Sequence, residues 1–171
     1  MTRIADTFSV LRSRHEAALV AYLTAGDPSL DVTPDLLRAL VAGGADLIEL
    51  GVPFSDPMAD GPVLQRAAAR AIKAGTTLGR VLEMVATRRR ECPVPIVLFG
   101  YYNPFFRYGV DAIARDAKAA GVDGFLCVDL PPEESGDLGA ALERNGLDLI
   151  HLLAPTTPIK RVATIAKASS G

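Results

Sequence analysis

Two carboxylates, Glu49 and Asp60, lie close together in the segment LIELGVPFSDPMADGP. Glu49 stands between Ile48 and Leu50 in a short apolar run that is typical of a buried strand, so we expect its carboxyl to be desolvated. Desolvation disfavours the charged form of an acid and raises its pKa. Because a carboxyl with a pKa nearer neutrality can both donate and accept protons at working pH, Glu49 is a candidate general acid and base.

Asp60 has a different setting, a loop that also contains Pro53, Pro57 and Pro62. We expect its carboxylate to be solvated and ionised, and therefore able to stabilise positive charge that develops on a ligand. The prolines restrict the loop and limit the entropy that is lost when it becomes ordered. Each acid also has a structural interpretation: Glu49 could be a core acid paired with Lys or Arg, and Asp60 could be a turn acid that bonds nearby backbone.

The strands that must position these acids share a repeated plan. The segments GGADLIEL, AGVDGFLCVDLP and NGLDLIHLLAP each contain a Gly, a spacer, an Asp and an apolar run. The Gly is typical of a helix C-terminal cap, and the run that follows is typical of a strand buried on both faces. Two further strands are expected near residues 18–24 and 95–102.

Helix-period stretches alternate with these strands, among them PDLLRALVAG, AIARDAKAAG and DLGAALERNG. The order is one helix and then strand–helix five times, which predicts a parallel sheet with right-handed crossovers. A doubly wound sheet is disfavoured because no G-x-G-x-x-G phosphate turn occurs. Polar and aromatic residues gather in the loops that follow the strands, as they do in a (β/α) barrel.

We therefore predict an α/β fold of the TIM (β/α)8-barrel family over residues 1–171, as a single domain with an extra N-terminal helix. A complete barrel has eight units and about 250 residues, whereas this sequence of 171 residues supplies about five units. The expectation is an incomplete barrel that lacks the C-terminal units. Five tilted strands would leave two open sheet edges.

The composition excludes several classes of function. The formal net charge is −2 and the longest basic run is Arg88–Arg90, which we expect to be a solvated helix face, so nucleic acid is not an expected partner. No apolar run is long enough to span a bilayer and the N-terminus has no signal-peptide pattern, so we expect a cytoplasmic protein without a membrane partner. Cys92 and Cys127 match no metal-ligand spacing.

Several motifs together resemble the tryptophan synthase α subunit family. The stretch LIELGVPFSDPMADGPVLQRAAARAIKAGTT is similar to the family signature, and AYLTAGDP, FGYYNPFFRYGVDAIARDAKAAGVDGFLCVDLPPEES and HLLAPTTP agree with the family in order and spacing. The resemblance implies a TIM-barrel lyase that cleaves indole-3-glycerol phosphate to indole and glyceraldehyde 3-phosphate in tryptophan biosynthesis. It also implies no cofactor and no metal in this chain, and an α2β2 assembly with a β subunit that carries pyridoxal phosphate.

The resemblance also implies roles for individual residues. Glu49 would move protons on and off carbon and oxygen in a retro-aldol step, and Asp60 would bind the indole N–H. The expected indole pocket is lined by Tyr22, Phe99, Tyr101, Leu126, Val128 and Leu152. The expected β-subunit interface contains Pro53, Asp56, Asn103 and Pro131. Ordinary core packing and simple connecting loops are the alternative interpretations of these two sets.

The sequence departs from the family pattern because it lacks the segments that would bind phosphate. Barrels of this kind commonly bind phosphate through the loops after strands seven and eight and a short helix N-terminus, and the sequence stops at Gly171. Lost phosphate contacts remove binding energy that positions the reacting centre, so we expect the chain to be poorly active alone. The alternative function is a non-catalytic truncated half-barrel that acts only as an interaction module for the β subunit.

Overall fold

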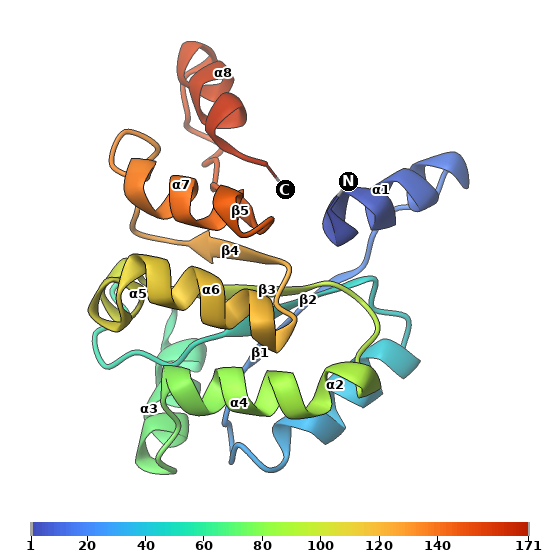
Figure 1. Cartoon of the computed structure of the whole chain (residues 1–171), viewed down its shortest axis with the longest axis vertical. Helices are drawn as coiled ribbons and strands as arrows, with labels where there is room; N and C mark the ends of the chain where they lie inside the picture. The colour runs from blue at the N-terminus through green and yellow to red at the C-terminus, as the bar shows by residue number, and fades with distance from the viewer. Residues whose placement is uncertain (1, 171) are drawn as a thin grey trace.

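A computed structural model describes residues 2–170 as a parallel sheet with helices between its strands (Figure 1). The strands are β1 (Val20–Thr24), β2 (Leu47–Gly51), β3 (Ile96–Gly100), β4 (Gly124–Cys127) and β5 (Asp148–Ile150). The helices are α1 (Arg3–Ser13), α2 (Thr33–Ala42), α3 (Pro62–Lys73), α4 (Leu78–Arg88), α5 (Tyr102–Tyr108), α6 (Val110–Ala120), α7 (Gly136–Arg144) and α8 (Ile159–Ala168), with a 3₁₀ turn η1 (Arg89–Glu91).

The sheet order is β1-β2-β3-β4-β5, and each strand pairs in parallel with the next. The strand order of a doubly wound sheet reverses at a switch point, whereas a (β/α) barrel adds strands in sequence. The observed order therefore confirms the predicted TIM-barrel-type α/β fold. The expected third strand is shorter than predicted, because it ends at Gly100 and Tyr102 already begins α5.

Alternate strand residues point to opposite sides, so the sheet has two distinct faces. The register pairs Tyr22 with Glu49 and Glu49 with Val97, which places all three on one side, here called the inner face. Two residues further along the strands, Gly51 pairs with Phe99, which is also on the inner face. The opposite side is the outer face.

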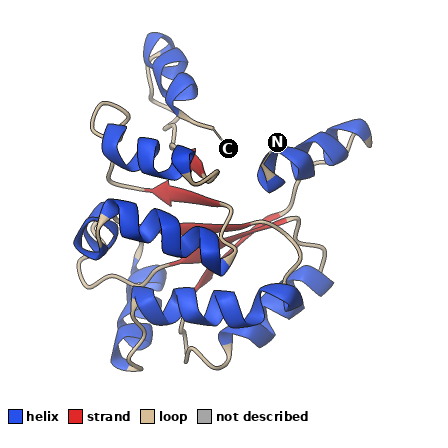
Figure 2. Cartoon of the chain, in the orientation of Figure 1, coloured by secondary structure: helices blue, strands red, loops and turns tan. Residues whose placement is uncertain are grey.

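The main hydrophobic core lies between the outer face and the surrounding helices (Figure 2). Ile48, Leu98 and Phe125 from the strands pack there with Val81 of α4 and Leu142 of α7, and all five are fully buried. Full burial of one such side chain contributes about 1.5–3 kcal/mol of transfer free energy. The helix stripes predicted from the sequence therefore cover the outer face and hold the strands in register.

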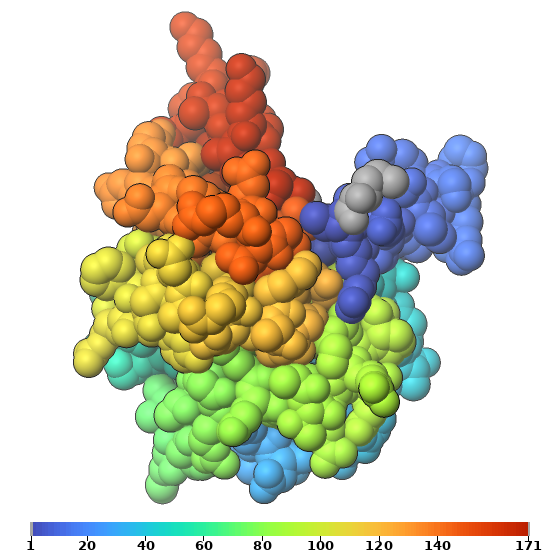
Figure 3. Space-filling view, viewed as in Figure 1, coloured from blue at the N-terminus to red at the C-terminus, as the bar shows by residue number. Residues whose placement is uncertain are grey.

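The inner face has a smaller apolar cluster. Ile4 of α1 packs against Leu47, Val97 and Leu126 near the N-terminal ends of the strands. The N-cap Thr2 accepts a hydrogen bond from the backbone N–H of Ala5 at 3.3 Å and so stabilises the start of that helix. In the space-filling view, α1 and α8 project from the body on either side of a notch (Figure 3).

The expectation that residues 88–90 form a solvated helix face is wrong for Arg89. Helix α4 ends at Arg88, and η1 turns the next side chain inward. The Arg89 guanidinium donates to the carboxylate of Asp123 at 3.0 Å and to the carbonyl of Gly121 at 2.8 Å. Arg89 and Asp123 are 14% and 10% exposed, so this ion pair is nearly buried. It ties the end of α4 to the start of β4.

Candidate active site

The inner face brings Glu49 to the C-terminal half of the sheet. Strand β2 forms from a Leu- and Ile-rich run, and its outer residues Ile48 and Leu50 are fully buried. This packing fixes the strand and turns Glu49, which is half-buried, to the inner face. Burial raises the pKa of the Glu49 carboxyl above its ordinary value, as we predicted from the flanking residues.

The structural interpretation of Glu49 requires a cation beside it. Over residues 2–170, Glu49 forms no ion pair with Lys or Arg. Desolvation is the cause of its raised pKa, and no charge of either sign offsets it. The carboxyl therefore holds its proton more firmly than an exposed glutamate does, which is the direction that favours a general acid or base.

The loop between β2 and α3 holds Asp60 through backbone contacts. The Asp60 N–H donates to the carbonyl of Pro57 at 3.1 Å, and the side-chain amide of Gln65 donates to the Asp60 carbonyl at 2.8 Å. Helix α3 begins at Pro62, where proline fits the first turn because it has no N–H to leave unpaired. These contacts set the position of the acid relative to β2.

The expectation that Asp60 is a freely solvated carboxylate is wrong. Asp60 is half-buried, and burial raises its pKa, while a hydrogen bond with the Tyr101 hydroxyl partly offsets this effect. The physical reason is the loop conformation, which folds the acid against β3 rather than out into water. Both acids therefore have raised pKa values, and the contrast between them is smaller than the sequence suggested.

Tyr101 is the residue that fixes this loop. Its ring is buried and packs against Phe54 with ring centroids 5.3 Å apart. Its hydroxyl accepts a hydrogen bond from the backbone N–H of Ala59 at 2.9 Å. We expected Tyr101 to line a ligand pocket, and these contacts give it a second task, the positioning of Asp60. No pattern in the sequence indicated a contact over this separation.

An apolar wall lies beside the acids on the inner face. Tyr22 and Phe99 pack edge to face with ring centroids 5.2 Å apart. Phe99 pairs in register with Leu126, and both belong with Val128 to the inner apolar cluster. Four of the six predicted pocket residues therefore form one surface, which could contact a flat apolar ligand.

Leu152 lies at the edge of that wall. It follows β5, is 55% exposed, and lines a hollow of about 330 Å³ together with Val128 of the wall and His151. The residue alternation of β5 would turn Leu152 to the inner face, but the strand ends at Ile150, so the alternation does not continue to it.

The four predicted interface residues all follow the C-terminal ends of strands. Pro53 and Asp56 lie after β2, Asn103 lies in the first turn of α5 after β3, and Pro131 lies after β4. Asp56 and Asn103 are exposed, whereas the two prolines are half-buried. They share one end of the sheet with the acids.

Two apolar side chains at this end are exposed. Met58 is 90% exposed in the loop before Asp60, and Phe106 is 61% exposed in α5. Apolar side chains are unfavourable in water, so an exposed group of them often marks a protein-binding surface. Phe106 follows the fully buried Phe105, and the sequence alone does not show which of the two rings is exposed.

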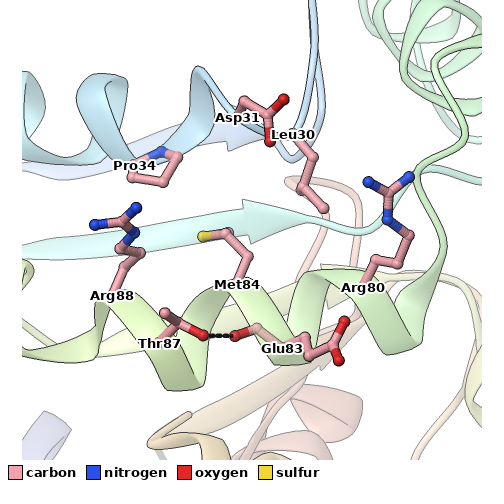
Figure 4. A pocket seen from close by; sticks show the side chains of 8 residues that line it. All are labelled: Leu30, Asp31, Pro34, Arg80, Glu83, Met84, Thr87 and Arg88. Carbon is pink, nitrogen blue, oxygen red and sulfur yellow. Dashed lines mark hydrogen bonds between the residues drawn. The ribbon is translucent and has the colours of Figure 1, made fainter.

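A second hollow lies far from this chemistry. The groove in Figure 4 has a volume of about 560 Å³ and runs between the start of α2 and α4. Those helices cover the outer face, so the groove is separated from Glu49 by the helix layer and the sheet. Its walls carry charges of both signs, from Asp31, Glu83, Arg80 and Arg88. It shares no residue with the inner face.

Two kinds of feature are absent from the described part of the chain. Among residues 2–170, no group of His, Cys, Asp and Glu side chains is arranged to hold a metal ion. No helix in the same part of the chain is long and apolar enough to cross a membrane.

Known proteins are similar to this chain in sequence and in structure. The family model described as tryptophan synthase alpha chain matches residues 8–171. The tryptophan synthase alpha chain of Geotalea uraniireducens is 53% identical over all 171 residues, and that of Solibacter usitatus is 54% identical. The chain covers 64% of the length of each of these two relatives, which is less than two thirds.

Solved structures agree with the sequence comparison. The tryptophan synthase subunit alpha of Legionella pneumophila superposes with a TM-score of 0.96 at 43% identity, over 100% of this chain and 66% of that one. A chain of tryptophan synthase from M. tuberculosis superposes with a TM-score of 0.95 at 39% identity, over 100% of this chain and 68% of that one. The chain belongs to the tryptophan synthase alpha chain family.

Proposed function

We propose that this chain provides the acid–base site of a lyase that cleaves indole-3-glycerol phosphate to indole and glyceraldehyde 3-phosphate in tryptophan biosynthesis. The observation that carries the proposal is the position of Glu49, a half-buried acid without a cation partner among residues 2–170, beside an apolar wall on the inner face. Membership of the tryptophan synthase alpha chain family supports this reaction over other barrel chemistry.

The reaction is a retro-aldol cleavage. The bond between indole C3 and the side chain breaks, its electron pair stays on the ring, and the side-chain hydroxyl becomes the aldehyde of the product. Glu49 delivers a proton to C3 and accepts the proton from the hydroxyl, and its raised pKa suits both transfers. Asp60 accepts a hydrogen bond from the indole N–H and stabilises positive charge that develops on the ring.

The apolar wall is proposed to bind the indole ring. Tyr22, Phe99, Leu126 and Val128 supply a flat surface at the side of Glu49. Tyr101 contributes to binding mainly by holding the loop that carries Asp60. In the proposed binding mode Glu49 faces C3 of the indole ring and Asp60 faces the ring nitrogen.

The partner is proposed to be a tryptophan synthase β subunit in an α2β2 assembly. The docking surface is the end of the sheet that carries Pro53, Asp56, Asn103 and Pro131, and the exposed Met58 and Phe106 supply apolar area there. The β subunit would supply pyridoxal phosphate and use the indole, and the assembly would work in the cytoplasm. Size-exclusion chromatography with light scattering would measure its stoichiometry.

Indole release tests the reaction directly. The chain is mixed with a tryptophan synthase β subunit and indole-3-glycerol phosphate, without serine, and indole is measured by chromatography. Chromatography separates the indole from both protein chains before it is measured. Asp60→Asn should lower release about 10²-fold, because one preorganised electrostatic contact is lost. The exposed Glu83 on α4 supplies the matched control, Glu83→Gln.

The same experiment tests the alternative of a non-catalytic interaction module. The exposed Met58 and Phe106 support docking of this chain to a β subunit, but they give no information about cleavage of the substrate. If the chain binds and activates the β subunit but releases no indole, the module replaces the lyase. Indole release that is lost in Asp60→Asn and kept in Glu83→Gln supports the lyase.

A further inference from the structure

The first turn of α5 is held by a side chain from the loop after β4. At the end of the two strands, a ladder hydrogen bond runs from the Val128 N–H to the Gly100 carbonyl at 3.0 Å. In a parallel pair the next donor from the side of β3 lies two residues further on, and this is the Tyr102 N–H. It donates to a carboxylate oxygen of Asp129 at 2.7 Å. The side chain of Asp129 thus connects the two segments where their backbone pairing ends.

This contact also caps α5. The N–H groups in the first turn of a helix have no partner within the helix. Tyr101 is at the N-cap position and makes no side-chain cap hydrogen bond, so the carboxylate of Asp129 supplies an acceptor from another loop. The Sγ of Cys127, the last residue of β4, donates to the same Asp129 oxygen at 3.4 Å. This second contact limits the directions in which the carboxylate can point.

The residue before Tyr102 connects this cap to the candidate active site. Tyr101 is only 5% exposed, and its hydroxyl accepts the Ala59 N–H at 2.9 Å. Ala59 immediately precedes Asp60 in the chain. Two hydrogen bonds, joined by the peptide bond between Tyr101 and Tyr102, therefore connect the loop after β4 to the loop that carries Asp60. These two loops follow strands that lie on either side of β3.

We propose that Asp129 is a positioning residue for Asp60. Its hydrogen bond with the Tyr102 N–H fixes the backbone from which the Tyr101 side chain projects, and the Tyr101 hydroxyl in turn holds the loop at Ala59. The effect of Asp129 on Asp60 is indirect, so Asp129 is not itself a catalytic residue. Its consequence for indole release rests on the proposed lyase function, whereas its effect on the loop does not.

Amide hydrogen exchange, followed by NMR, tests the effect on the loop. Asp129→Ala removes the acceptor of the Tyr102 N–H, so the Ala59 amide should exchange about tenfold faster than in the wild type, as loss of one hydrogen bond would produce. Asp129→Asn removes the same negative charge but keeps an oxygen acceptor, and should leave the Ala59 rate close to that of the wild type. If Asp129→Ala does not fold, Asp129→Leu replaces it, because leucine has a similar branched shape and no acceptor.

Two controls separate this local effect from a general loss of stability. The Gly26 N–H donates to a threonine hydroxyl at 3.0 Å in the loop after β1, three strands away from β4, and its exchange should not change. Asp46→Ala is the matched variant, because the Asp46 carboxylate accepts the Leu19 N–H at 2.8 Å near the N-terminal ends of β1 and β2. It should accelerate the exchange of Leu19 and leave that of Ala59 unchanged.

The kinetics of indole release test the consequence for Asp60. With the β subunit at saturation, Asp129→Ala should lower kcat about tenfold through misplacement of the acid, and Asp129→Asn should retain most of the activity. Tyr101→Phe removes the hydroxyl that holds the loop and should lower kcat at least as much. Because both changes act on the same contact, the double variant Asp129→Ala, Tyr101→Phe should be no less active than Tyr101→Phe alone. Additive losses would show that Asp129 acts by another route and would overturn the inference.

The outcomes separate the inference from the proposed function. If Ala59 exchange is unchanged in Asp129→Ala while Leu19 exchange rises in Asp46→Ala, the inference about Asp129 is wrong. It is also wrong if Ala59 and Gly26 accelerate equally, or if Asp129→Asn behaves like Asp129→Ala. If the wild-type chain with the β subunit releases no indole, the lyase proposal fails, and the exchange measurements still test Asp129.

Discussion

Asp123, beside the N-terminal ends of β3 and β4, differs in its partners from Glu49 and Asp60, which lie toward the C-terminal end of the sheet. At the N-terminal end, Asp123 accepts hydrogen bonds from Arg89 at 3.0 Å and from the backbone N–H of Ile96 at 2.9 Å. A second cation, Arg3, lies 3.5 Å from the same carboxylate. At the C-terminal end, Glu49 and Asp60 form no ion pair within residues 2–170.

The presence or absence of a cation beside the carboxylate distinguishes an acid that stabilises the fold from an acid that could exchange protons with a ligand. An arginine partner lets a carboxylate connect elements, as Arg89 connects α4 to β4 through Asp123, although burial raises the pKa of Asp123 too. An acid that is desolvated without a cation has a raised pKa and can exchange its proton. The Arg89–Asp123 pair therefore connects elements of the fold, whereas Glu49 without a cation is a cost in stability that the proposed active site would explain.

The largest expected effect is on the chemistry of the C-terminal end. Glu49→Gln keeps the size of the side chain but cannot transfer a proton, so indole release should fall by about 10²–10⁴-fold. The rate is measured with the β subunit present, and circular dichroism checks that the variant is folded. Retention of more than a tenth of the wild-type rate would show that another group moves the proton.

The next effect is on stability at the N-terminal end. Arg89→Met keeps most of the side-chain volume but leaves Asp123 without its closest cation, so the free energy of unfolding should fall by about 3 kcal/mol. Urea denaturation measures this change. Arg115→Met is the control, because the Arg115–Asp116 pair is on the surface and should contribute less than about 1 kcal/mol. Equal losses in the two variants would remove the contrast between buried and exposed pairs.

A third prediction concerns the space beside the acids. Gly51→Ala places a methyl group against the Tyr22 ring and should destabilise the chain by about 1–3 kcal/mol. The double variant Gly51→Ala, Tyr22→Leu should recover part of this loss, because the ring that causes the clash is gone. Thermal unfolding measures both. Gly79→Ala, where an added Cβ meets no atom within 4 Å, is the control.

The smallest expected effect is on the pH dependence of stability, through the protonation of Glu49. The folded-state pKa of Glu49 is raised, so protonation stabilises the fold below its ordinary pKa of 4.5, and this contribution is lost as pH rises through the folded-state pKa. Glu49→Gln should therefore be slightly more stable than the wild type at pH 7, with the difference disappearing below pH 4.5. Urea denaturation at several pH values measures it. A wild type that is more stable than the variant at pH 7 would contradict the desolvation of Glu49.

Sequence periodicity predicted most elements of the fold, but not α5, whose first residues were assigned to a strand and the loop after it. The repeated Gly–spacer–Asp–apolar plan predicted β2, β4 and β5, and the observed strand order agrees with the barrel that the missing Gly-rich turn favoured. The same local pattern predicted that Glu49 would be desolvated, because its neighbours Ile48 and Leu50 are apolar and short-range sequence determines a strand's alternation.

The environments of Asp60, Arg89 and Leu152 depended on contacts between residues far apart in the chain. Asp60 is half-buried because the Tyr101 hydroxyl bonds the loop that carries it, and Arg89 points inward because η1 redirects the backbone toward Asp123. Leu152 is exposed because β5 ends before it.

The sequence by itself determined which segments are strands and helices, their order, and the family to which their motifs are similar. Only the tertiary structure decided which acids meet a cation, which meet a phenol and which side chains share the inner face. The physical reason is range: alternation and capping are local properties of the backbone, whereas desolvation and ion pairing depend on groups that folding brings from distant parts of the chain.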